Sequence, residues 1–222
     1  LETGGPAAIS RDGQTVAVVA ADESGTTRIW THSLNALEAT SLRGTEGGSH
    51  PFWSPDSRFI GFFAQGRLQR IAATGGATRT IAEAPQGRGG AWSVNGVIVF
   101  APGFTDSLFR VPAEGGDIEP VTAIDFSNRE TSHRWPVFLP DGRRFLFYVR
   151  SDRAEVSGLY LGALDSGQRT RVGDMRSSAA YAKTGSGDEY LVFAHEGFLA
   201  AQRFSPTEGR LVGEMARILQ LT

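Results

Sequence analysis

The stretch PFWSPDSRFIGFF, residues 51–63, places an aromatic pair before a Ser-Pro-Asp-Ser segment and then a run of strand-forming residues. Pro, Asp and Ser favour a tight turn, because Pro presets φ and the short polar side chains bond to the backbone that follows them. The aromatic and β-branched residues after the turn favour a buried strand. The stretch therefore predicts a β-hairpin whose second strand lies in a core.

The same order of features recurs along the whole chain. Its turn signals begin at residues 10, 54, 93, 139 and 183, as SRDGQ, SPDSR, SVNG, LPDGR and the looser KTGSGDEY. After each turn come a β-prone run, a third run, a second turn such as ATGGA (73–77) or AEGGD (113–117), and a last short strand. Four antiparallel strands in every 40–45 residues or so are typical of a β-propeller. Two β-sandwich domains, the alternative, would not explain the even spacing.

We therefore predict an all-β chain that forms a single β-propeller domain, residues 1–222, of about five four-stranded antiparallel blades. The expected blades are approximately residues 5–43, 48–84, 89–123, 132–173 and 176–220. Either a closed five-blade ring or a partial propeller fits the sequence. A partial propeller would leave open blade edges through which chains could self-associate. The chain starts at Leu1 without an initiator Met, and we expect it to be an excised soluble domain of a longer protein.

The composition excludes several classes of protein. The chain has no Cys, which excludes a disulfide scaffold and thiolate zinc sites. Its net charge is -2 and it shows no basic stripe, so we expect no nucleic-acid partner. No apolar stretch approaches the roughly 18 residues that a membrane-spanning helix needs.

The repeat pattern W-S-P-D-S/G-R-x-apolar-x-F, with Gly-Gly after the third strand, resembles the TolB-like propeller repeat. The Trp-Asp and Gly-His pairs of the WD repeat are missing. More narrowly, some segments are similar to the propeller that follows the membrane helix of many bacterial serine/threonine protein kinases: GTEGGSHPFWSPDSRFIGFF (44–63), RGGAW (88–92), VIVFAPG (97–103) and ETSHRWPVFLPDGRRFLF (130–147). The resemblance implies a sensor or interaction domain on the periplasmic or extracellular side of a bacterial membrane protein.

The predicted function is therefore ligand or protein binding without catalysis, and no cofactor is expected. Kinase motifs are absent, and TGSGD (184–188) departs from the Gly-x-Ser-x-Gly nucleophile elbow at its first position. Three alternatives stay open: a cell-envelope protein–protein scaffold of TolB type, a propeller polysaccharide lyase, and the gating propeller of an oligopeptidase.

In a propeller, the loops that lead from one blade to the next gather at one mouth of the central channel. Here they are residues 45–51, 85–91, 125–136 and 174–179. We expect their polar side chains to converge there and to bind a protein or a small polar or anionic ligand. The candidate ligand-binding residues are His50, Arg88, Glu130, Ser132, His133, Arg134 and Arg176.

A structural interpretation of these residues stays open, because such loops also use polar side chains to satisfy buried carbonyls. Arg134 could equally pack on Trp135 as a cation–π pair. His50, Glu130 and His133 are suitable metal ligands by type, but no metal site is predicted. The Asp and Asn residues of the blade turns are expected to form Asx-turns, and the strand aromatics to form the core.

Overall fold

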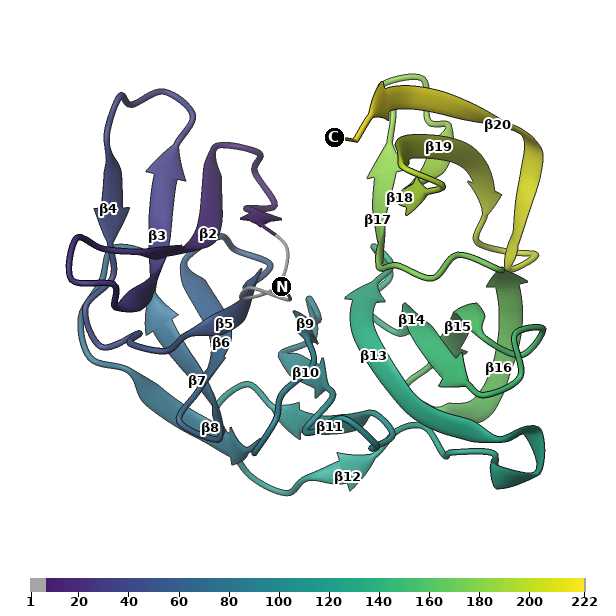
Figure 1. Cartoon of the computed structure of the whole chain (residues 1–222), viewed down its shortest axis with the longest axis horizontal. Coiled ribbons are helices and arrows are strands. Elements are labelled where there is room, and N and C mark those ends of the chain that lie inside the picture. The colour runs from purple at the N-terminus through teal and green to yellow at the C-terminus, as the bar shows by residue number, and fades with distance from the viewer. Residues whose placement is uncertain (1–6, 222) are drawn as a thin grey trace. The chain divides into compact units, whose positions relative to one another are not determined.

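The computed structural model describes residues 7–221, and these form twenty β-strands and one 3₁₀ helix (Figure 1). The strands make five sheets, each of four antiparallel strands in sequence order. The predicted fold class, an all-β propeller of five four-stranded blades, is confirmed. No helix among the described residues is long and apolar enough to cross a membrane.

The chain divides into two compact units, which we describe separately. Of the described residues, unit 1 holds 7–104 and 108–120 and contains the first three blades. The first blade is β1 (Ala8–Ile9), β2 (Thr15–Ala21), β3 (Thr27–Ser33) and β4 (Ala39–Ser41). The second is β5 (Ser49–Trp53), β6 (Phe59–Ala64), β7 (Arg67–Ala72) and β8 (Arg79–Glu83). The third is β9 (Gly90–Trp92), β10 (Val97–Phe100), β11 (Phe109–Pro112) and β12 (Glu119–Pro120).

Unit 2 holds residues 105–107 and 121–221 and contains the last two blades. The 3₁₀ helix η1 (Phe126–Asn128) precedes the fourth blade, which is β13 (Glu130–Phe138), β14 (Arg144–Ser151), β15 (Gly158–Ala163) and β16 (Ser166–Gly173). The fifth blade is β17 (Ala179–Lys183), β18 (Glu189–His195), β19 (Phe198–Ser205) and β20 (Arg210–Gln220).

The Ser-x-Asp turn closes the first hairpin of a blade with side-chain hydrogen bonds. Ser54 Oγ accepts from the Phe59 N–H at 2.8 Å and donates to Asp56 Oδ1 at 2.6 Å. The first blade repeats the second of these bonds, between Ser10 and Asp12, at the same length. Both serines are 2% exposed, so the bonds satisfy hydroxyls that would otherwise be buried unpaired. The aspartates accept from backbone N–H groups two residues on, as an Asx-turn requires.

The core of unit 1 packs aromatic rings against glycine. A Cβ atom on Gly61, in the same blade as Phe52, would lie 2.3 Å from the Phe52 ring, and a Cβ on Gly87, in the next loop, 2.0 Å from the Phe63 ring. No side chain fits at either position, so Gly61 makes room for the Phe52 ring within the second blade, and Gly87 makes room for the Phe63 ring beside the loop to the third. Of the predicted core aromatics, six are at most 9% exposed, whereas Trp92 and Trp135 are half-buried; the six are Trp53, Phe62, Phe63, Phe100, Phe145 and Phe147.

A residue with positive φ lies within, or directly before, the innermost strand of three blades. This residue is His50 in the second blade (φ 48°), Gly89 in the third (φ 96°) and Trp135 in the fourth (φ 52°). The strand register shifts across His50 and across Trp135, which marks a β-bulge at each. A bulge bends a strand and re-aims its side chains. The residues just before it, Ser49, Arg88 and Arg134, therefore occupy equivalent places in the three blades.

Candidate functional site

Unit 1 contains a pocket of about 290 Å³, which we call the Arg88 pocket. It is formed by the two loops that lead into the second and third blades, by the β6–β7 turn and by Phe104. His50 and Arg88 both line it, so the structure brings together the two candidate residues of unit 1. Gln65 of the β6–β7 turn and Phe104 also line it, and the sequence did not single them out.

Arg88 is held against the aromatic wall of its pocket. Its guanidinium carbon lies 3.7 Å from the centre of the Phe104 ring, a contact distance for a cation–π pair. Its backbone N–H donates to the Ala101 carbonyl at 2.9 Å, and the Gln86 N–H donates to the Pro102 carbonyl at 3.0 Å. Two backbone bonds thus fix the loop that carries the cation.

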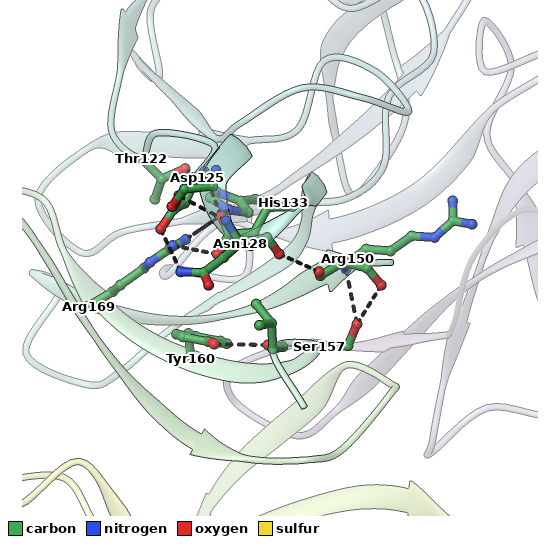
Figure 2. Close-up of polar contacts among 12 residues, drawn as sticks. Thr122, Asp125, Asn128, His133, Arg150, Ser157, Tyr160 and Arg169 are labelled. Atoms are coloured by element: carbon green, nitrogen blue, oxygen red, sulfur yellow. Dashed lines mark hydrogen bonds and ion pairs between the residues drawn. The ribbon is translucent and has the colours of Figure 1, made fainter. Parts of the chain in front are cut away.

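In unit 2, Glu130 and His133 belong to a buried polar network (Figure 2). Arg169, on β16, donates to both carboxylate oxygens of Glu130, at 2.5 and 2.9 Å. His133 Nε2 lies 3.1 Å from Glu130 Oε2, and its Nδ1 lies 2.8 Å from the Thr122 hydroxyl. The Asp125 N–H donates to Glu130 as well, at 2.9 Å.

Burial and pairing set the charges of this network. Burial alone would raise the pKa of Glu130, but hydrogen bonds from His133 and Arg169 outweigh it and hold the pKa below its ordinary value. Burial lowers the pKa of His133, against the opposing effect of the bond to Glu130. At neutral pH the network is therefore a carboxylate–guanidinium pair with a neutral imidazole.

Unit 2 has a pocket of about 170 Å³, and none of the five candidate residues of this unit lines it. Thr122 and Arg169, which contact His133 and Glu130, do line it. Arg134 Nε donates to Ser132 Oγ at 2.8 Å, and these two side chains are 7% and 0% exposed. Arg176 is exposed. Glu130 and His133 are 3% and 0% exposed. The present partners of these buried residues lie within the fold, and a role for them in ligand binding stays a prediction.

Two side chains of the network, those of Thr122 and Arg169, were not predicted. Arg169 lies 39 residues after Glu130 on the outermost strand of the same blade, and its contact depends on how that blade packs. Among the residues that the structure describes, no group of three or more His, Asp or Glu side chains is placed to hold a metal ion.

No protein-family model and no curated protein sequence matches this chain. Among solved structures, TolB from Acinetobacter baumannii matches with a TM-score of 0.70 at 13% identity, over 92% of this chain and 52% of that one. The fold is a TolB-like β-propeller. The chain spans about half the length of the Acinetobacter TolB, and at this identity the likeness concerns the fold alone.

Two further structures share the TolB-like fold at a TM-score of 0.68. One is a candidate TolB from Agrobacterium tumefaciens, 16% identical over 96% of this chain and 80% of that one. The other comes from a nidogen/laminin complex, 14% identical over 93% and 80% of the two chains. The resemblance of the sequence repeat to TolB-like propellers is thus confirmed in three dimensions.

Propellers of enzymes match as well. An oligogalacturonate lyase in complex with manganese gives a TM-score of 0.53 at 12% identity, over 96% of this chain and 76% of that one. Prolyl oligopeptidase B from Galerina marginata gives a TM-score of 0.57 at 10% identity, over 97% of this chain and 34% of that one. One propeller fold hosts many activities, so function has to be argued from the site.

Proposed function

We propose that this TolB-like propeller binds a protein or a small polar ligand without catalysing a reaction, as the extracytoplasmic sensor or interaction domain of a bacterial signalling kinase or regulator. The observation that carries the proposal is the Arg88 pocket, where the entry loops of two successive blades present a cation and polar side chains around one space. Loops held by a rigid scaffold are the usual place for recognition.

Resemblances in sequence and in structure give two further lines of support. The segments 44–63 and 130–147 resemble propellers that follow the membrane helix of bacterial kinases. The nidogen/laminin match is a complex of two proteins, so a propeller of this fold occurs in a protein–protein assembly. A cell-envelope scaffold of TolB type is the second candidate, and the two TolB structures favour it.

The burial of the polar residues argues against a lyase or a peptidase role for unit 2. A general base or charge stabiliser has to reach the substrate. His133 is 0% exposed and already bonded on both ring nitrogens, and Arg134 is 7% exposed. Neither side chain can meet a polysaccharide without rearrangement of the blade.

Assays of turnover test the non-catalytic part of the proposal. The purified chain is incubated with oligogalacturonate and Mn²⁺, and separately with short peptides. We expect no unsaturated uronate, followed by ultraviolet absorbance, and no peptide cleavage, followed by mass spectrometry. Turnover above that of a heat-denatured sample would overturn the proposal in favour of an enzyme.

Thiol labelling in cells tests the extracytoplasmic location. The chain has no Cys, and Leu37 is fully exposed at 101%, so Leu37→Cys creates a single accessible thiol in this domain. We expect a membrane-impermeant maleimide to label the variant protein in intact cells and to leave the unsubstituted protein unlabelled. Labelling that requires permeabilised cells would contradict the location.

Self-association through blade edges is part of the proposal. β20 is the edge strand of the fifth sheet, it is eleven residues long, and Ile218 and Leu219 on it are 55% and 59% exposed. A long exposed edge strand offers unpaired backbone groups to another chain. We expect light scattering to give a mass that rises with concentration. The mass of a single chain at every concentration would contradict this.

A further inference from the structure

We infer that the Arg88 pocket is a carboxylate-binding site, suited to a carboxylate on a short body that is partly apolar, such as the end of a peptide. The inference rests on the proposed binding function, and it names the site and the chemistry of the ligand.

The charge of the lining favours an anion. Arg88 supplies a permanent positive charge, and His50 adds a ring nitrogen donor or acceptor. None of the residues that line the pocket, all within the described part of the chain, is acidic. The lining therefore presents a positive charge and no carboxylate to a ligand.

The single guanidinium favours a carboxylate over a phosphate group. A planar guanidinium can donate two parallel hydrogen bonds to the two oxygens of a carboxylate. A phosphate dianion would be left half neutralised by one cation, and no Lys lines the pocket. The contact with Phe104 and the backbone bond to Ala101 hold Arg88 in place before a ligand arrives. This lowers the entropy cost of binding.

The rest of the lining defines the body of the ligand. The Phe63 ring forms part of the wall, and it fills the space that a side chain at Gly87 would need. Ala64, Ala84 and Pro85 add apolar surface, while Gln86 adds an amide. The volume of about 290 Å³ lies at the lower end of the roughly 300–1,000 Å³ of small-molecule sites. It suits one or two amino-acid residues or a small organic acid.

Two backbone features bring their side chains to the pocket. His50 has a positive φ of 48° and belongs to the β5 bulge, which re-aims the side chains of that strand. Gln65 and Gly66, at φ 54° and 74°, form the two-residue hairpin turn between β6 and β7. The bulge and the turn both border the pocket.

Isothermal titration calorimetry tests the inference with three probes: acetyl-trialanine with a free carboxylate, the same peptide as its C-terminal amide, and succinate. We expect the unsubstituted chain to bind at least one carboxylate probe, and to bind the peptide acid at least ten-fold more tightly than the amide if a peptide end is the source. Binding of succinate alone would identify a free acid as the source.

Substitution of Arg88 locates the site. Arg88→Gln removes the charge, and we expect it to weaken binding of the carboxylate probe at least ten-fold. Arg43→Gln, a loss of one exposed positive charge elsewhere in unit 1, serves as the matched control and should leave affinity unchanged. If Arg88→Gln does not fold, as judged by circular dichroism, Arg88→Lys is measured instead. This variant keeps the positive charge and loses the planar guanidinium that can donate two parallel hydrogen bonds. It should weaken binding several-fold.

Two outcomes overturn the inference. Carboxylate affinity that is unchanged in the folded Arg88 variant would place the ligand elsewhere, while the proposed binding function would stand. Failure of the unsubstituted chain to bind any probe would refute carboxylate recognition itself. The proposed function is decided separately, by the turnover assays and the labelling in cells.

Discussion

The ring of Phe52 lies directly in front of Gly90: a Cβ atom on Gly90 would be 2.5 Å from that ring. Gly61, which pairs with Phe52 across the neighbouring strand, is equally close, since a Cβ there would lie 2.3 Å from the same ring. Phe52 is 7% exposed and is packed on its other sides as well. Close contact between the second and third blades therefore requires that position 90 has no side chain. Packing thus explains Gly90 of the segment RGGAW, whereas Gly89 has a positive φ of 96°.

Gly90→Ala should destabilise unit 1. The added methyl group overpacks the contact with Phe52, and overpacking typically costs about 1–3 kcal/mol. Gly167→Ala is the matched control, because a Cβ at Gly167 would meet no atom within 4 Å. Urea unfolding followed by Trp fluorescence measures both. Equal midpoints for the two variants would show that the Phe52 contact does not restrict this position.

Removal of Arg169 should cost about 3–5 kcal/mol, because it leaves the buried carboxylate of Glu130 without its cation. Glu130 is 3% exposed, and Arg169 bonds both of its oxygens. Arg169→Gln is compared with Arg203→Gln, which breaks an exposed pair with Asp188 that is worth at most about 1 kcal/mol. Chemical denaturation of the two variants should show a clear difference, and similar losses would contradict the account.

The Glu130–Arg169 pair also makes the free energy of unfolding depend on pH in the acidic range. The pKa of Glu130 is lowered in the folded chain, so its ionised form stabilises the fold above the pKa of the unfolded chain. This contribution is lost as pH falls through the folded value. We expect the stability of the unsubstituted chain to fall on acidification more steeply than that of Glu130→Gln. Parallel curves of unfolding free energy against pH for the two chains would argue that the ionised form of Glu130 does not stabilise the fold.

The fifth blade should lose stability in alkali. Burial, with a hydrogen bond to Glu189, raises the pKa of Tyr181 to about 12. Because the folded pKa exceeds the ordinary value of about 10, the contribution is complete below pH 10 or so and is lost as pH rises toward 12. Tyr181→Phe should flatten this fall. Ultraviolet titration of the phenols gives an independent reading of the pKa.

His50→Gly should stabilise the fold, or leave it unchanged, although it removes a side chain. A left-handed conformation costs a non-Gly residue about 1–2 kcal/mol, and Gly avoids that cost. Gly89 occupies the equivalent place in the third blade without this cost. The opposing effects include the lost His50–Phe63 ring contact and the greater entropy of the unfolded chain. Thermal unfolding measures the balance, and a loss above about 1 kcal/mol would mean that the side chain matters more than the backbone.

Local chemistry explains which parts of this molecule could be predicted from its sequence. Ser54 and Asp56 define a hairpin within six residues, so the turn signals alone locate the strands. The pairing of Arg88 with Phe104 and of Glu130 with Arg169 depends on blade packing between residues 16 and 39 positions apart, and nothing local encodes it. The bulge at Trp135 is another feature that the local sequence does not fully encode. The Trp-Pro pair suggests a bend, but the positive φ appears only in the folded strand.

The most direct test of the central claim is a backbone NMR titration of the chain with acetyl-trialanine acid. The account predicts that amide signals of the Arg88 pocket shift in proportion to occupancy, above all those of residues 47–50, 65–66 and 86–88, and that the Arg88→Gln chain shows no such shifts. Shifts that cluster outside these segments, or that persist in Arg88→Gln, would contradict it.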